Sequence, residues 1–128
     1  GMVSPAGDLA RFCGMMLGEG ELDGVRVLSS RSVGIATGNN LVHFPSVPEA
    51  DQRTRPWGYG WRLNWPAHAA SFGDLLPAEV YGHWGATGTL FWIDPLHESA
   101  AVILSSQPME KDRSLIVRIS NAIAAALV

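Results

Sequence analysis

Residues 81–104 of the chain are YGHWGATGTLFWIDPLHESAAVIL, three apolar runs separated by turns that contain T-G and D-P. Short runs rich in aromatic and β-branched residues, with Gly or Pro between them, are typical of antiparallel strands joined by hairpins. The pattern predicts three strands, over Val80 to Ala86, Thr89 to Ile93 and Ala100 to Leu104. We therefore expect an antiparallel sheet in the second half of the chain.

The last predicted strand, Ala100 to Leu104, is apolar at every position. A strand that is apolar on both faces normally lies in the middle of a sheet rather than at its border. A fourth strand is predicted over Gly58 to Trp65, where large apolar residues alternate with small or polar ones. The large residues would share one face of that strand: Tyr59, Trp61, Leu63 and Trp65.

Helices are predicted on both sides of the strand region in the sequence. The first has Ser4 as its N-cap, Pro5 at its first position and Gly18 and Gly20 at its end. Apolar residues at spacings of three and four form its buried stripe: Leu9, Phe12, Cys13, Met16 and Leu17. A short second helix is predicted from Ser29 or Ser30 to Thr37, followed by a long loop over residues 39–56.

The C-terminal helix is predicted from about Asp112 to Leu127. Its buried stripe would consist of the apolar residues at helical spacing: Leu115, Ile116, Ile119, Ile123, Ala126 and Leu127. Helices before and after an antiparallel sheet of three to four strands indicate an α+β domain, and we expect the helices on one face of the sheet.

The composition is that of one folded domain covering residues 1–128, with 47% hydrophobic and only 16% charged residues. This balance excludes a disordered chain. The net charge of −3 and the scattered basic residues argue against nucleic-acid binding. The longest apolar tract is too short to cross a bilayer, and the N-terminus has no signal-peptide pattern, so we expect neither feature. The compartment stays undetermined.

No cofactor or metal is predicted. The four histidines have no helical ligand spacing and Cys13 is the one cysteine, which argues against zinc. Because Cys13 lies within an apolar stripe, we expect a buried, inert thiol. Glycine-rich phosphate loops and the Gly-x-Ser-x-Gly nucleophile motif are absent from the sequence. The polar residues between Asp94 and Glu98 are better explained by an exposed hairpin turn than by catalysis.

The order of four motifs resembles the serine β-lactamase and penicillin-binding-protein superfamily, with class C β-lactamases, related esterases and D-alanyl-D-alanine carboxypeptidases most similar. The motifs are SPAGDLARF at residues 4–12, GELDGVRVLS at 20–29, WGYGW at 57–61 and the HWGATG segment that begins at His83. The resemblance covers nearly the whole chain. It implies a partial β-lactamase-like domain, the C-terminal part of the family fold.

Carried over by position, His83 takes the place of the Lys or His of the family's active-site triplet and would contact a substrate carboxylate. The resemblance makes Gly85 the residue that lets substrate approach the strand. It makes the Ala86 N–H one of two oxyanion donors, groups that stabilise charge in acyl transfer. Trp84 replaces the usual small middle residue and could crowd a β-lactam carboxylate, which favours an esterase-like or degenerate site.

The family's nucleophile and base motifs, Ser-x-x-Lys and Tyr-x-Asn or Ser-x-Asn, do not occur in these 128 residues. The one lysine, Lys111, has Pro108 three positions before it. Three hypotheses remain: a β-lactamase-related fragment without hydrolytic activity alone, one half of a split enzyme that needs a Ser-x-x-Lys chain, or a non-catalytic interaction module. The resemblance also implies that Ala100 to Leu104 lacks its pairing strand, which predicts a homodimer or a complementary N-terminal chain at that edge, or a homodimer through the C-terminal helix.

Overall fold

A four-stranded antiparallel sheet organises the computed structural model, which describes residues 3–65, 72–108 and 113–127. The strands lie in the order β3-β4-β5-β6, so neighbours in sequence are neighbours in space. Their bounds are β3 (Arg62–Leu63), β4 (Tyr81–Gly85), β5 (Thr89–Asp94) and β6 (Ser99–Leu104). The antiparallel sheet and the three predicted strands of residues 80–104 are confirmed, each to within one residue.

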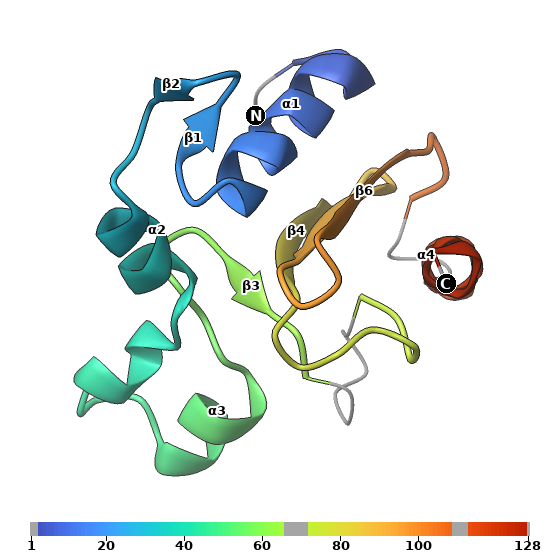
Figure 1. Cartoon of the computed structure of the whole chain (residues 1–128). Helices are drawn as coiled ribbons and strands as arrows, with labels where there is room; N and C mark the ends of the chain where they lie inside the picture. Colours follow the sequence, from blue (N-terminus) through green and yellow to red (C-terminus); the bar gives the residue numbers. More distant parts are fainter. Residues whose placement is uncertain (1–2, 66–71, 109–112, 128) are drawn as a thin grey trace.

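The two long helices lie on opposite faces of this sheet, as Figure 1 shows with the strands seen edge-on between them. Helix α1 (Ala6–Leu17) and helix α4 (Ser114–Ala126) each cover one of two separate apolar clusters. Because side chains alternate along a strand, Trp92 packs in the α4 cluster and Ile93 in the α1 cluster. The expectation that both helices share one face is wrong, since each face carries apolar residues that need cover.

Strand β6 ends the described sheet at an edge, and the expectation that it lies in the middle is wrong for this chain. Its apolar character has another cause. Ala101 and Ile103 face the α4 cluster, whereas Ala100 and Val102 face the α1 cluster. Both rows of side chains are therefore covered by helices although one backbone edge has no strand beside it in the described residues.

Helix α1 begins one residue later than predicted, because Pro5 is its N-cap and makes no side-chain capping bond. Ser4 donates its hydroxyl hydrogen to the Pro5 carbonyl instead of capping the helix. The buried residues of α1 are Cys13, Met15 and Met16, while Phe12 is 38% exposed and stacks on Trp61. The prediction is thus correct for Cys13 and Met16, which are buried, but Phe12 is more exposed than predicted.

A small hairpin and a short helix follow α1. Strands β1 (Glu21–Leu22) and β2 (Val25–Arg26) are joined through Asp23 and Gly24, both with positive φ, as a tight two-residue turn requires. Helix α2 (Ser30–Thr37) matches its prediction. The Ser29 hydroxyl accepts the Ser32 N–H at the start of α2, and Gly38 follows its end.

Residues 39–56 are not the unbroken loop that was predicted. They contain a 3₁₀ helix, η1 (Asn40–His43), and helix α3 (Glu49–Thr54). Neither element has an apolar stripe, and α3 has no buried residue, so hydrophobic periodicity could not reveal them. Their ends are held by polar contacts: the Asn39 side chain accepts the Leu41 N–H and donates to the Gln52 carbonyl.

The predicted strand over Gly58 to Trp65 is reduced to the two residues of β3. The Gly58 N–H donates to the Trp61 carbonyl, which closes a tight turn in which Gly60 has φ of 78°. Trp61 is buried whereas Tyr59 is 57% exposed, so the alternating large residues do not share one face. The turn glycines, rather than the aromatic residues between them, decide the local backbone.

Helix α4 begins at Ser114, and the predicted start at Asp112 lies outside the described residues. Its buried positions are Ile116 and Ser120, with Ile123 and Ala124 also packed on the sheet. Trp92 donates its Nε1 hydrogen to the Ser120 hydroxyl at 2.9 Å, which places a polar residue at the centre of the interface. The predicted stripe is therefore rotated, because four of its six members are exposed: Leu115, Ile119, Ala126 and Leu127.

Candidate active-site edge

Strand β4 carries the HWG triplet and is paired on both sides along only part of its length. Strand β5 pairs with all five of its residues, but β3 pairs only with Tyr81 and Gly82. From His83 onward the other side of β4 has no strand partner among the described residues. We call His83 to Gly85, together with Ala86 at the start of the turn that follows, the open edge of β4.

The backbone direction at the open edge follows from the hydrogen bonds at the paired end. The Asn64 N–H donates to the Val80 carbonyl, so Val80 directs its backbone groups towards β3. Alternate residues of a strand point their N–H and C=O groups to the same side. Counting by twos from Val80 gives Gly82 and Trp84 that same direction, and Ala86 follows the strand as the first residue of the turn in which the Gly88 N–H donates to the Gly85 carbonyl. Ala86 is exposed, and its N–H makes no backbone hydrogen bond within the described part of the chain.

The imidazole of His83 is held in one tautomer. Its Nδ1 lies 2.8 Å from the Trp84 carbonyl, and a carbonyl oxygen can only accept. Nδ1 therefore carries a hydrogen and donates it, which leaves Nε2 of the neutral ring with an unshared electron pair. The ring of Trp57 packs against His83 with centroids 5.5 Å apart, so both a hydrogen bond and a ring contact fix its position.

Two arginines converge on the neighbouring residue, Trp84. The guanidinium carbon of Arg113 lies 4.6 Å from the Trp84 ring centroid and that of Arg62 lies 5.0 Å away. Arg62 also lies 5.5 Å from the Trp57 ring. Guanidinium groups over tryptophan faces are held by cation–π attraction and retain their hydrogen-bond donors for other groups. The Trp84 Nε1 atom is buried and makes no hydrogen bond in the described structure.

The surroundings of Arg62 are electropositive. Its partial burial lowers its pKa from the ordinary value, and the positive charges of Arg113 and Arg55 lower it further. No ion pair joins Arg62 or Arg113 to a residue that the structure describes. Arg55 is partly neutralised by Asp51 at 3.7 Å. Three positive charges near one strand end favour an anionic group.

Two glycines of β4 have different surroundings. A Cβ atom on Gly82 would collide with the backbone carbonyl of Phe91 on β5. A Cβ on Gly85 would meet the hydroxyl oxygen of Thr89 at 2.6 Å, a side-chain atom that can move. Gly82 is therefore required for strand pairing, whereas Gly85 leaves space at the open edge.

The remaining sequence candidates lie elsewhere. Burial raises the pKa of the Cys13 thiol to about 11, in agreement with the predicted inert cysteine. The expected exposed turn at residues 94–98 is only partly correct, because Asp94 is buried. Its carboxylate accepts the backbone N–H groups of Leu96 and His97 and lies 2.7 Å from His97 Nδ1. No group of three potential metal ligands is found in residues 3–65, 72–108 and 113–127.

Sequence reasoning located the HWG triplet but missed the arginines and Trp57 around it. Trp57 belongs to the WGYGW motif, which was assigned only to a strand. Arg62 and Arg113 are far apart in sequence and belong to no shared motif, so no spacing rule could bring them together. Their proximity follows from two separate connections, one that places β3 beside β4 and one that returns the chain to α4 under Trp84.

The fold and the open edge together define a class: a partial α+β domain in which one strand offers a histidine and the turn after it offers an unpaired N–H. The chain belongs to the β-lactamase family, whose model matches residues 1–124. A protein of Escherichia coli O157:H7 described as a D-alanyl-D-alanine carboxypeptidase is 33% identical over 109 residues, and one of Salmonella typhi with the same description is 34% identical.

Solved structures show the same fold. A β-lactamase of Mycobacterium bovis superposes on 97% of this chain with a TM-score of 0.73 and 24% sequence identity. A penicillin-binding protein homologue of Caulobacter crescentus superposes on 78% of the chain with a TM-score of 0.58. The chain spans 23% of the length of the carboxypeptidase relatives and 44% of the β-lactamase chain. The partial-domain character implied by the resemblance agrees with these shares.

No helix in the described ranges is long and apolar enough to cross a membrane.

Proposed function

We propose that this chain forms one wall of a serine acyl-transfer site that acts on a β-lactam, an ester or a D-alanyl peptide. The observation that carries the proposal is the open edge of β4, where a fixed histidine and an unpaired backbone N–H lie within four residues of each other. A strand edge of this kind can receive a substrate as an added strand, with main-chain hydrogen bonds supplying affinity.

His83 contributes through Nε2. Because Nδ1–H is engaged by the Trp84 carbonyl, a neutral His83 offers Nε2 as a hydrogen-bond acceptor, and a protonated His83 offers it as a donor. In the first state it orients a hydroxyl or ammonium group. In the second it pairs with a substrate carboxylate.

Ala86 contributes its backbone N–H. When a nucleophile attacks an acyl carbon, negative charge develops on the carbonyl oxygen, and a donor already in place stabilises that charge. The second donor of such a pair and the nucleophile are provided by a part of the site outside these 128 residues, since the sequence holds no Ser-x-x-Lys.

Arg62 and Arg113 favour a substrate that carries a carboxylate. Both are anchored on the Trp84 ring and neither is neutralised by a described acidic residue. The bulky Trp84 thus has a role as a platform for the two guanidinium groups. This supports β-lactams and D-alanyl peptides, both of which carry a carboxylate, over simple esters within the proposed substrate class.

The chain alone is expected to be inactive, and acylation tests this most directly. Purified protein should not hydrolyse nitrocefin or p-nitrophenyl acetate, and its intact mass should not increase with benzylpenicillin. A covalent adduct of one penicillin would contradict the proposal, because it would require a nucleophile within these 128 residues.

A split enzyme is the second candidate, favoured by the unpaired β6 edge. Co-expression with a chain that carries Ser-x-x-Lys and Tyr-x-Asn should then restore nitrocefin hydrolysis. In the restored enzyme, His83→Ala should lower the rate by about 100-fold, the usual scale for an acid–base residue. His43→Ala on the exposed η1 is the matched control. Restored activity that is insensitive to His83→Ala would refute the role of the open edge.

A partner polypeptide is expected to bind at strand β6 and at the exposed apolar residues of α4. Ser105 donates its N–H to the Gly88 carbonyl, so Ser105 and every second residue before it point their backbone towards β5. Ala100, Val102 and Leu104 therefore point their N–H groups outward. A complementary N-terminal segment or a second copy of this chain would pair there. Sedimentation at tens of micromolar should show a dimer. A monomer would exclude pairing with a second copy of this chain, and the complementary N-terminal segment would then be the remaining partner proposed for β6.

A further inference from the structure

Trp57, the first residue of the WGYGW motif, lies next to the open edge of β4 although it belongs to none of the strands. It is partly buried, and a single antiparallel bridge pairs it with Arg62 at the start of β3. The tight turn closed by Gly58 and Trp61 causes this pairing, because it reverses the direction of the chain. The residue that follows the motif is thereby brought back beside the motif's first residue.

The indole ring of Trp57 contacts two groups of the proposed acyl-transfer site. The His83 ring meets it in an edge arrangement, with centroids 5.5 Å apart and an interplanar angle of 62°. The guanidinium carbon of Arg62 lies 5.5 Å from the centroid of the same indole and 5.0 Å from that of Trp84. Aromatic rings attract both ring edges and cations, so these contacts are favourable. One side chain thus joins the histidine to the arginine.

The backbone around Trp57 is anchored to the end of helix α2. The last carbonyls of a helix have no partner within it and need donors from elsewhere. The Tyr59 N–H donates to the Ala36 carbonyl at 2.8 Å, and the Asn40 side chain donates to the Ile35 carbonyl at 2.8 Å. The Asn40 N–H in turn donates to the Trp57 carbonyl at 2.7 Å. Two separate connections therefore tie the position of Trp57 to α2.

Asn40 and Gly58 make this anchor specific. Asn40 is polar but only 7% exposed, and its side chain also donates to the Gly38 carbonyl at 3.1 Å, so both hydrogens of its amide group have acceptors. A fully satisfied buried polar group favours one arrangement of the groups around it. A Cβ atom on Gly58 would collide with the Ala36 carbonyl, so glycine is required for the segment to approach α2 this closely. These contacts hold Trp57 in one position relative to α2.

We propose that Trp57 is a positioning residue of the acyl-transfer site, which holds the His83 imidazole and the Arg62 guanidinium in a fixed relation. Asn40 acts through it. The role rests on the proposed function, since Trp57 supplies no chemistry of its own. The hydrogen bond from His83 Nδ1 to the Trp84 carbonyl is a local contact that water can replace, and the Trp57 ring supplies the second contact that keeps Nε2 at the open edge. A carboxylate on Arg62 and a group bonded to Nε2 must then lie a fixed distance apart.

The tautomer of His83 gives a direct test in the 128-residue chain. Long-range ¹⁵N–¹H spectra at about pH 8.5, where exposed imidazoles are neutral, distinguish a ring with its hydrogen on Nδ1 from one with its hydrogen on Nε2. Wild-type His83 should show the Nδ1–H form, whereas exposed His43 should show the mixture of a free imidazole. In Trp57→Leu, His83 should move towards that mixture. An unchanged Nδ1–H form in folded Trp57→Leu would overturn the proposal, because a purely structural tryptophan alters stability without altering the tautomer.

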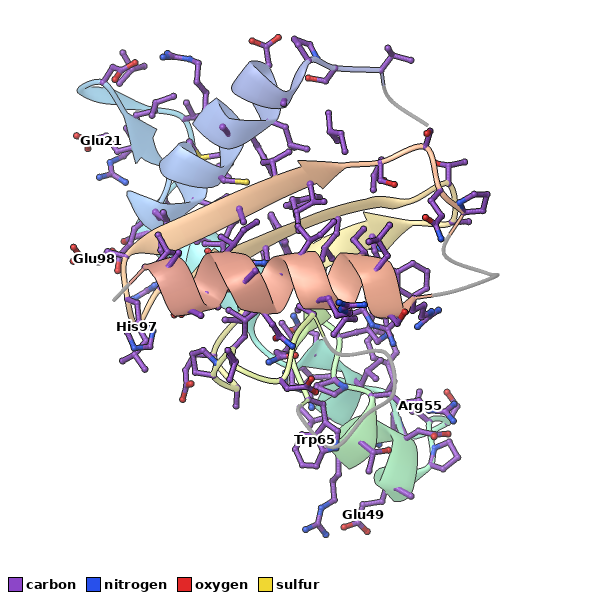
Figure 2. The ribbon with its side chains drawn as sticks, turned by 90° about the vertical axis from the view of Figure 1, so that its right-hand side faces the viewer. Glu21, Glu49, Arg55, Trp65, His97 and Glu98 are labelled. Carbon is purple, nitrogen blue, oxygen red and sulfur yellow. The ribbon has the colours of Figure 1, made fainter. Side chains whose placement is uncertain are left out.

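Further variants separate the aromatic ring from its bulk. Trp57→Phe keeps a ring and should retain most of the Nδ1–H form. Asn40→Ala should change the tautomer in the same direction as Trp57→Leu but less, because Asn40 acts only through the Trp57 backbone. Trp65→Leu is the matched control: Trp65 is exposed and makes no ring or cation contact with a described residue, and Figure 2 shows its side chain well below the sheet in that view. Equal changes in Trp65→Leu and Trp57→Leu would refute the role of Trp57.

Spectra of the wild-type protein test the same contacts if Trp57→Leu does not fold. Nuclear Overhauser effects should connect the ring hydrogens of Trp57 with those of His83. The ring currents of the two indoles should also move the Arg62 Nε–H signal away from that of exposed Arg53. Absence of the Overhauser effects would overturn the proposal without any variant.

Binding of acetyl-D-alanyl-D-alanine separates this role of Trp57 from the proposed function. The dipeptide should shift the Arg62 signal and saturate, and Trp57→Leu should weaken its affinity about threefold, the scale of one exposed cation–π contact. Equal affinities would overturn the part of the proposal that concerns Arg62. If the wild-type chain binds no dipeptide, the carboxylate part of the proposed function fails, whereas the tautomer still decides whether Trp57 positions His83.

Discussion

The two edges of the four-stranded sheet leave backbone groups unpaired in different ways. At one edge the short strand β3 covers only the first two residues of β4, and the uncovered part is surrounded by His83, Trp57 and arginines. At the other edge β6 has no strand beside it along six residues in the part of the chain that the structure describes, and its side chains from Ala100 onward are apolar on both faces. Unpaired strand backbone is therefore surrounded by polar and aromatic side chains at β4 and by apolar side chains at β6.

Under the proposed function, this difference would separate an edge that binds substrate from an edge that pairs with another polypeptide. Polar and charged side chains around a short uncovered stretch can select a small anionic substrate and discourage another strand. A long apolar strand with regular outward N–H groups has nothing to oppose pairing with another polypeptide. The predictions below test whether the two edges are as distinct as their surroundings indicate.

The largest expected effect concerns the two sides of β6. Ala101→Pro removes an N–H that points towards β5 and should destabilise the fold by about 3 kcal/mol or more. Ala100→Pro removes an outward N–H and should cost less than about 1 kcal/mol, because proline is tolerated at strand edges. Urea unfolding measures both. If the chain is a dimer through β6, Ala100→Pro should also make it monomeric.

Equal destabilisation by the two proline variants would mean that the outward N–H groups are already paired in the folded protein.

A smaller effect is expected along β4, where the paired end meets the open edge. Gly82→Ala should destabilise the protein by about 1–3 kcal/mol, because the new methyl group would collide with the Phe91 carbonyl. Gly85→Ala should cost under about 1 kcal/mol, since the Thr89 side chain can rotate away. Thermal unfolding distinguishes them. A larger loss for Gly85→Ala would indicate that the open edge is as tightly packed as the paired end.

The smallest expected effect is alkaline destabilisation at the paired end of β4. Burial raises the pKa of Tyr81 from 10.0 to about 12 and that of Cys13 from 9.0 to about 11. Folding therefore favours the neutral forms, and their contribution to stability is complete below pH 9 and is lost progressively as the pH rises towards 12.

At pH 11, wild-type protein should lose about 1 kcal/mol through Tyr81 alone, relative to Tyr81→Phe, when both are compared with their stabilities at pH 8. Urea titrations at the two pH values measure this difference. A tyrosinate absorbance titration of Tyr59→Phe, which leaves Tyr81 as the one tyrosine, gives the Tyr81 pKa independently. A Tyr81 transition near pH 10 would show that its ring is accessible to water.

Strand prediction was most accurate where local and tertiary preferences agree. The runs that became β4, β5 and β6 are dense in β-branched and aromatic residues, and the hairpin turns between them specify their pairing. The Gly58 to Trp65 segment has an equally strong alternation, but its Gly58 and Gly60 allow a tight turn that brings Trp61 under Phe12 and Tyr81. Burial of the Trp61 ring therefore decides the backbone of this segment more strongly than the alternation of large and small residues does.

The helices were predicted less accurately than these strands, because burial of a helical residue depends on tertiary contacts as well as on its hydrophobicity. The stripe of α4 was predicted from apolar residues alone, yet Ser120 faces the sheet because Trp92 donates a hydrogen bond to it. Helix α3 has no buried residue and could not be found from periodicity. A sequence pattern records which residues are apolar, whereas the rotation of a helix depends on the particular side chains that it meets.

The sequence by itself determined the family, the order of the antiparallel strands and the position of the HWG triplet, because these depend on residues adjacent in the chain. Only the tertiary structure decided that helices cover both faces and that Arg62 and Arg113 meet on Trp84. These groups are brought together by packing between distant segments, and no local preference of the backbone encodes a distance between residues that are far apart in sequence.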